Sequence, residues 1–349
     1  MKKFLKILLI SVLTIAVAFS MVACSDQPGG GNGGRKGLVG KRQDDTWVIY
    51  KYVDDEADAG VLDIGAKLDL PDGVTKVKIK ANAFSDNGTL TKIIVPEAVT
   101  EIEAGAFAKM HKLKELHLPF IGQVKNADAF EFESDEAYDE DKAVDAERTI
   151  AHLFGTEVYD NGTSVTINYG SGTKNCYMPE TLNKIVINAS NYKVPMHAFD
   201  GLTYVENIVL SGTVTEIGQY AFANTRISSI EIPTTVSIVH EYAFNNSKVE
   251  NVLFASTATD GSIEIRDGAF SGCENVNYIG AGTVTDNTID LVKFKFTSDF
   301  GGFIATPVEI GADAFNFGND DKKDENKVYT VLNKGSLDLN KLFGNTILA

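Results

Sequence analysis

The stretch "TEIGQYAFANTRISSIEIP", residues 215–233, joins an Ala-Phe pair to a short alternating apolar run that ends at a proline. Closely similar stretches are "TEIEAGAFAKMHKLKELHLP" at 100–119 and "SIVHEYAFNNSKVENVLF" at 237–254. Ala-Phe pairs recur along the chain with successive spacings of 23, 23, 69, 23, 22, 26 and 45 residues, and 69 is three times 23. Such a period indicates a repeat protein in which each unit is one coil of a stack.

The apolar positions within a unit predict its local structure. An aliphatic residue precedes the Phe by five positions, as Ile217 precedes Phe222, and the last two apolar residues are two apart, as in Ile230 and Ile232. This alternation places both side chains on one face of a β-strand, and the following proline ends the strand because it lacks an N–H. A unit can bury that face only against its neighbours, so we predict parallel strands about 4.8 Å apart.

One Phe per unit is then expected inside the stack, at the same height in every coil. These residues should form an aromatic ladder of Phe84, Phe107, Phe130, Phe199, Phe222, Phe244, Phe270 and Phe315. The predicted fold class is therefore a repeat solenoid, a β-rich coil stack with a parallel sheet and little helix.

The period also divides the chain. We expect N-terminal cap strands at 38–70 and a solenoid of units of 22–23 residues at 71–345. Two stretches interrupt the period, an acidic insertion at 131–147 and a long insertion at 280–309.

The first residues have the pattern of an export signal. Residues 1–23 have a basic start, an apolar run and small residues at the end, which is typical of a signal peptide. The sequence "MVAC" resembles a bacterial lipobox, and this implies that Cys24 is lipid-modified and becomes the mature N-terminus. A plain secretory signal with an incidental cysteine is the alternative. Residues 24–37 are rich in Gly and predict a flexible tether, so we expect an exported protein anchored in the cell envelope through its lipid.

Composition excludes one class of partner and supports a packed core. The chain has 48 acidic and 32 basic residues, a net charge of −16, whereas binding to nucleic acid needs clustered Lys and Arg. Nucleic acid is therefore not an expected partner. The hydrophobic content of 44% is enough for a sizeable core.

No catalytic or metal-binding motif stands out. The five histidines (His111, His117, His152, His197, His240) are scattered, and Cys176 and Cys273 lie 97 positions apart, without metal-ligand spacing. We expect two buried thiols, with a single disulfide as the alternative. The segment 131–147 has nine acidic residues against one Lys; it lacks a calcium-loop spacing, and a solvated charged loop is favoured over a Ca²⁺ site. We expect neither an enzyme nor a cofactor.

The candidate functional surface is the row of residues between the two inward-facing positions of successive strands. These residues are Ile94, His117, Val186, Val209, Glu231 and Leu253. Four of the six are aliphatic, which predicts a hydrophobic binding stripe. The alternative is that branched residues simply favour strands.

The units "IEAGAFAKMHKLKELHLP" and "IGQYAFANTRISSIEIP", together with "AFSGC" at 269–273, resemble those of the BspA-like bacterial surface leucine-rich repeat family. The resemblance covers about residues 65–345. It implies a curved, right-handed solenoid with a concave parallel sheet, display at the cell surface and, as in some members, adhesion to host proteins such as fibronectin or fibrinogen. We therefore expect an adhesin-like, non-enzymatic protein whose partner is a protein or a glycan. A structural lipoprotein of the cell envelope without an external ligand is the alternative.

Overall fold

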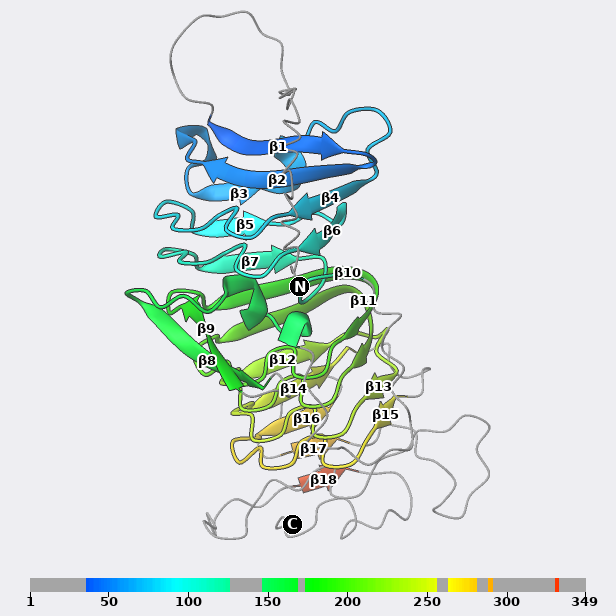
Figure 1. The fold of residues 1–349 in the computed structure, drawn as a ribbon. Helices are drawn as coiled ribbons and strands as arrows, with labels where there is room; N and C mark the ends of the chain where they lie inside the picture. The colour runs from blue at the N-terminus through cyan, green and yellow to red at the C-terminus, as the bar shows by residue number, and fades with distance from the viewer. Residues whose placement is uncertain are drawn as a thin grey trace, which may run out of the picture.

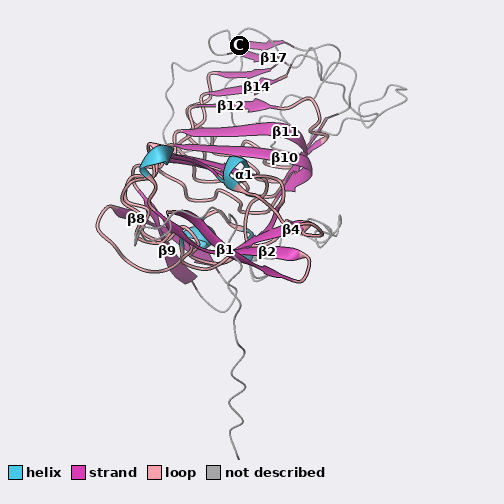
Figure 2. Ribbon diagram, turned by 90° about the horizontal axis from the view of Figure 1, so that it is seen from above, coloured by secondary structure: helices cyan, strands magenta, loops and turns pink. Residues whose placement is uncertain are grey.

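The protein is a solenoid of stacked β-coils in the computed structural model, which describes residues 36–125, 146–168, 173–255 and 263–280 and the backbone of 288–290 and 330–332. Figure 1 shows the strands lying one above another from β1 to β18. Strands make up nearly all the regular structure, and the helices are short (Figure 2). The strands are β1 (Gly37–Gln43), β2 (Thr46–Val53), β3 (Val61–Asp63), β4 (Lys76–Ile79), β5 (Lys92–Ile94), β6 (Val99–Ile102), β7 (Glu115–Leu118), β8 (Gly162–Asn168), β9 (Thr173–Pro179), β10 (Lys184–Val194), β11 (Asn207–Ile217), β12 (Ser229–Ile232), β13 (Ile238–Val239), β14 (Asn251–Phe254), β15 (Glu264–Ile265), β16 (Tyr278–Gly280), β17 (Thr288–Asp290) and β18 (Thr330–Leu332).

Helical structure in the described residues consists of single turns. The helices are α1 (Ile64–Lys67) and the 3-10 turns η1 (Glu56–Asp58), η3 (Ala146–Arg148) and η4 (Ala151–Phe154). No helix among the described residues is long and apolar enough to cross a membrane. The prediction of a repeat solenoid with parallel sheets and little helix is therefore confirmed.

The coils pair through three sheets, and apart from β1 with β2 every strand pairing between coils in the described residues is parallel. The strand orders are β1-β2-β4-β6, β15-β13-β11-β10-β7-β5-β3 and β12-β14-β16-β17-β18. Equivalent residues of successive coils face each other, as Ile49, Ile79 and Ile102 do across β2, β4 and β6. All three are fully buried, because each coil covers the apolar face of the next.

Two strands, β10 and β11, are eleven residues long and run through both strand positions of their coils. In coils that carry Pro96, Pro119 or Pro233 the chain breaks after the first strand position. The equivalent places in β10 and β11 hold Asn188 and Ser211, which keep their N–H groups and pair with each other. The absence of proline therefore lets the strand continue.

Phenylalanine rings form a stacked row inside the solenoid. Phe84, Phe107, Phe199, Phe222, Phe244 and Phe270 are at most 1% exposed. Adjacent rings from Phe199 to Phe270 have centroids 4.9–5.0 Å apart. The predicted members Phe130 and Phe315 lie outside the described residues.

Two further rings extend this row. Phe154 of η4 lies next to Phe107, with centroids 6.0 Å apart, and is buried. Tyr52 stacks on Phe84 at 6.0 Å, so the row begins within residues 38–70, where we expected N-terminal cap strands. Strands β2 and β3 are thus already one coil, and β1 alone covers the edge of its sheet.

The coil of Phe154 carries a large insertion. After η4 the chain forms the antiparallel hairpin β8–β9, and only then reaches β10, which pairs with β7. The hairpin leaves the stack at one side (Figures 1 and 2). Its inward side chains Val165, Ile167, Cys176 and Met178 are buried.

Several predicted segments lie outside the described residues. These are the signal peptide 1–23 with Cys24, all but the end of the tether 24–37, most of the acidic insertion 131–147 and nearly all of the insertion 280–309. Cys176 and Cys273 are both buried and form no disulfide within the described residues, as expected for two buried thiols.

Candidate functional site

The predicted stripe is assembled in part by the register of the strands. Ile94 of β5 lies beside His117 of β7, and His117 lies beside Val186 of β10. Val186 in turn lies beside Val209 of β11. Four of the six predicted residues therefore form one row across neighbouring parallel strands.

The row does not continue as one sheet. Glu231 of β12 pairs with Leu253 of β14, but these strands belong to a different sheet, and β11 and β12 are not paired with each other. The break falls where the coil length changes. Leu210 follows Phe199 by eleven positions, whereas Ile232 follows Phe222 by ten. The prediction of six residues side by side on one sheet is therefore wrong at this point.

Exposure along the row is uneven. Val209 is 41% exposed, and Ile94 and Leu253 are half-buried, but Val186 is only 8% exposed. Side chains alternate between the two faces of a strand, and this alternation shows which face a residue occupies but not what covers that face. The burial of Val186, between His117 and Val209, was therefore not predictable. The exposed apolar surface is thus a set of separate patches rather than a continuous stripe.

His117 belongs to a charged cluster on this face. Its Nε2 lies 2.6 Å from Oε1 of Glu115, and the same oxygen receives Lys184 Nζ at 3.1 Å and Lys92 Nζ at 3.2 Å. The hydrogen bond from His117, with those from the two lysines, lowers the pKa of Glu115 to about 2. The ring of His117 is therefore held by a carboxylate rather than presented as part of an apolar patch.

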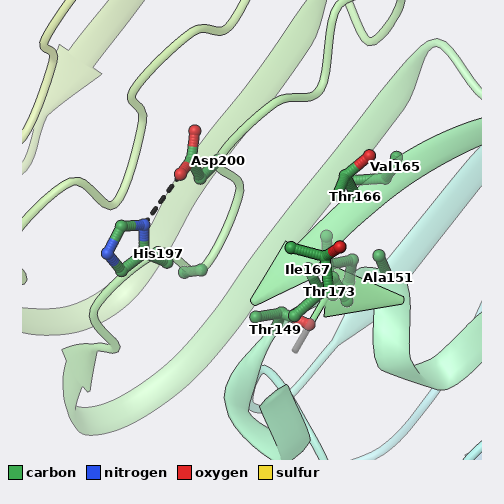
Figure 3. A pocket seen from close by; sticks show the side chains of 10 residues that line it. Thr149, Ala151, Val165, Thr166, Ile167, Thr173, His197 and Asp200 are labelled. Carbon is green, nitrogen blue, oxygen red and sulfur yellow. Dashed lines mark hydrogen bonds and ion pairs between the residues drawn. The ribbon is translucent and has the colours of Figure 1, made fainter. Parts of the chain in front are cut away.

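A small cavity lies between the hairpin and the turn that carries His197. It has a volume of about 160 Å³ and is lined by Thr149, Val165, Ile167, His197 and Asp200, among others (Figure 3). His197 Nδ1 lies 2.7 Å from Oδ2 of Asp200. The cavity was not foreseen because its walls come from the inserted hairpin, whose position no repeat spacing encodes.

The arrangement around His197 resembles a packing contact more than a catalytic dyad. The ring stacks on Tyr220, with centroids 5.0 Å apart and planes at 4°. Asp200 also accepts a hydrogen bond from Asn224 Nδ2 at 2.9 Å. His197 Nε2 is buried without a hydrogen-bond partner among the described residues, so no nucleophilic hydroxyl or thiol is placed to transfer a proton to it.

His240 lies in a second charged cluster, across β11, β13 and β15. Its Nε2 is 2.9 Å from Glu216 Oε2, and Arg266 Nη1 lies 3.2 Å from its Nδ1. Since arginine can only donate, Nδ1 accepts and Nε2 carries the proton. Burial is the largest cause of the lowered pKa of His240, so the neutral ring is favoured.

Metal chemistry finds no support in the part of the chain that is described. No group of three or more His, Cys, Asp or Glu side chains there is arranged to hold a metal ion. The remaining histidines are engaged in local pairs, such as His111 with Asp86 at 3.1 Å.

The comparison with protein families identifies the repeat. The model of the BspA type leucine rich repeat region matches residues 66–137 and 172–297 in six copies. This chain belongs to that family. The matched residues span the BspA-type coils from β4 to β17 and leave out residues 138–171, which include Phe154 and strand β8 of the hairpin, the main departure from the repeat.

Solved structures that are similar to this BspA-type protein are other bacterial leucine-rich repeat proteins. One is a T. pallidum leucine rich repeat protein, at 15% identity and a TM-score of 0.34, covering 80% of this chain and 86% of that one. Others are a leucine-rich repeat protein from Bacteroides ovatus (15% identity, TM-score 0.23, 91% and 99% covered) and a leucine rich cell surface protein from Faecalibacterium prausnitzii (20%, 0.25, 67% and 64%). No curated protein matches the chain.

Proposed function

We propose that this protein is an exported, surface-anchored binding module that contacts a protein partner through the strand face of its solenoid and performs no chemistry. The observation that carries the proposal is the exposed apolar surface of that face, where Val209 is 41% exposed and Ile94 of the same row and Leu253 of the next sheet are partly exposed. An apolar side chain that a sheet presents to solvent is a natural contact point for a partner, whose binding would remove it from water.

The mode of attachment is part of the proposal. Residues 1–23 supply an export signal, Cys24 a lipid, and the Gly-rich residues up to 37 a spacer that holds the solenoid off the membrane. Replacing Cys24 by Ser should abolish incorporation of labelled fatty acid and move the protein from the membrane fraction to the soluble fraction. Release of the unchanged protein into the medium would instead indicate a plain secretory signal.

The strand face is tested by a screen of the full chain against extracellular proteins, followed by substitution. The double variant Val209→Asp and Leu253→Asp should lower the affinity for any partner found by about tenfold or more, because it places charge against an apolar contact. Val158→Asp is a matched control, since Val158 is 70% exposed but lies outside the row. Equal binding by the double variant and the control, with unchanged thermal unfolding, would exclude this face.

A structural role in the envelope without an external ligand is the second candidate. It differs in exposure, because an adhesin must be reachable from outside. Protease added to intact cells should cleave the solenoid in the first case and spare it in the second.

A further inference from the structure

The loops that precede β12 and β14 are shorter than their neighbours. In the coils of Phe199 and Phe270 the first apolar residue before the strand comes six positions after the Phe, at Val205 and Val276. In the coils of Phe222 and Phe244 it comes after five positions, at Ile227 and Val249. Two short loops therefore lie between two long ones.

Small polar residues make the shorter path possible. At the third position after the Phe, Leu202 and Cys273 fill the long coils, whereas the short coils have Thr225 and Ser247. Thr225 Oγ1 donates a hydrogen bond to the Phe222 carbonyl at 2.8 Å and lies 3.0 Å from Ser247 Oγ. Ser247 Oγ in turn accepts a hydrogen bond from the Val249 N–H at 3.3 Å. Both residues are fully buried, so their hydrogen bonds hold the short loops from the interior of the solenoid.

The result is an open hollow of about 820 Å³ across four successive coils. Thr203 of the preceding long loop lines one end, and Glu274 and Asn275 of the following long loop line the other. Arg226 and Lys248, at equivalent positions of the two short loops, lie between them. We name this hollow the notch.

The lining of the notch is polar throughout and has no aromatic or large aliphatic side chain. Its other members are Asn224, Thr225, Ser228, Asn246, Glu250 and Gly272. Guanidinium, ammonium and amide groups supply donors, and carboxylate and amide oxygens supply acceptors. The side chain of Arg226 makes no hydrogen bond or ion pair within the described residues, and Lys248 has only a 3.8 Å contact with Glu274.

From this geometry we propose that the notch is a carbohydrate-binding site for a short oligosaccharide. A sugar carries a hydroxyl on nearly every carbon, and each hydroxyl both donates and accepts, which matches a lining of mixed donors and acceptors. A protein partner would be expected to anchor through an aromatic or aliphatic side chain in an apolar pocket, and the notch offers none. Four coils at about 4.8 Å spacing extend over roughly 15 Å, enough for about three sugar rings.

The site is separate from the strand face proposed above, so each can be tested without the other. The full chain is applied to an array of neutral and acidic tri- and tetrasaccharides, and the affinity for each glycan retained is then measured by titration. Arg226→Ala should weaken binding by about tenfold, because it removes a charged donor. Lys112→Ala removes an exposed cation from the equivalent loop of a long coil and should leave affinity within about twofold of the wild type.

A second variant tests the space itself. Ser228 is exposed, so Ser228→Trp should fold normally and should abolish glycan binding by filling the notch. Retention of no glycan by the wild type would overturn the proposal, as would binding by the Ser228→Trp and Arg226→Ala variants that equals binding by the wild type. Loss of a peptide ligand in these two variants, with no glycan bound, would assign the notch to a protein partner instead.

Discussion

The rings of Phe222 and Phe244 stack nearly parallel, with their centroids 4.9 Å apart and their planes at 4°. The spacing matches the distance between hydrogen-bonded strands, because each ring belongs to the coil beside the other. Backbone bonds hold the same register, since the Phe222 N–H donates to the Ala243 carbonyl at 2.7 Å. The aromatic row and the backbone ladder thus reinforce each other.

Removing one ring from the row should be costly. Phe222→Ala is expected to lower the free energy of unfolding by about 3–5 kcal/mol, because it leaves a cavity between two stacked neighbours. Urea titration measures the change, and Phe222→Leu, which refills part of the volume, should cost less. An unchanged urea midpoint for Phe222→Ala would mean that the ring does not support the core.

The turn around each Phe imposes a backbone requirement. Two positions before the Phe the chain is left-handed, as at Tyr242 with φ of 55° and at Gly268 with φ of 61°. A Cβ on Gly268 would also overlap the ring of Tyr242. Gly268→Ala should therefore lower the free energy of unfolding by more than about 1 kcal/mol.

Gly88 provides the control for that substitution. A Cβ there would meet nothing within 4 Å, and Gly88 lacks the positive φ of Gly268. Gly88→Ala should be neutral or slightly stabilising in the same thermal unfolding experiment. Equal effects at the two glycines would contradict the proposed role of the turn.

His240 should make stability depend on pH. Its folded pKa lies below the unfolded value, so the unfolded chain binds the proton more readily as pH falls below about 6.5. Stability is expected to fall as the pH drops below about 6.5, and His240→Gln should flatten that slope. His111→Gln should keep it. The lowered pKa of Glu216 acts at more acidic pH, below its unfolded value of 4.5, so urea titrations at several pH values separate the two groups.

The Glu115 cluster should also make stability depend on pH, through a carboxylate rather than a histidine. The folded pKa of about 2 lies below the unfolded 4.5, so its stabilisation is present above pH 4.5 and is lost as pH falls through about 2. Glu115→Gln should lower the free energy of unfolding at pH 7 by about 1–2 kcal/mol, and the difference from the wild type should vanish in strong acid. Glu56→Gln, at a side chain that is 96% exposed, should have no measurable effect.

The repeat was readable from the sequence because one coil is encoded by short-range spacing. The positions of Ile217, Phe222 and Ile230 recur at fixed distances in successive coils, and the burial of these residues follows from the stacking of the coils. The role of Phe154 was harder to see, because the hairpin inserted after it separates the ring from its strand, and Phe130 stood at the expected spacing.

The surface was less predictable than the core. Val186 and Val209 occupy equivalent positions of adjacent strands, yet one is buried and the other exposed. The notch depends on one residue missing before Ile227 and before Val249. The spacing of 22 from Phe222 to Phe244 shows the first loss without telling where it falls, and the spacing of 26 from Phe244 to Phe270 hides the second.

Strand β1 sets a limit on assembly. It runs antiparallel to β2, contains a bulge between Val39 and Gly40 and carries Lys41 and Arg42, whereas every coil beyond it adds in parallel. A second molecule therefore finds no matching template at this edge of the sheet. Strand addition from outside is disfavoured there, although the interior of the solenoid is itself built by repeated strand addition.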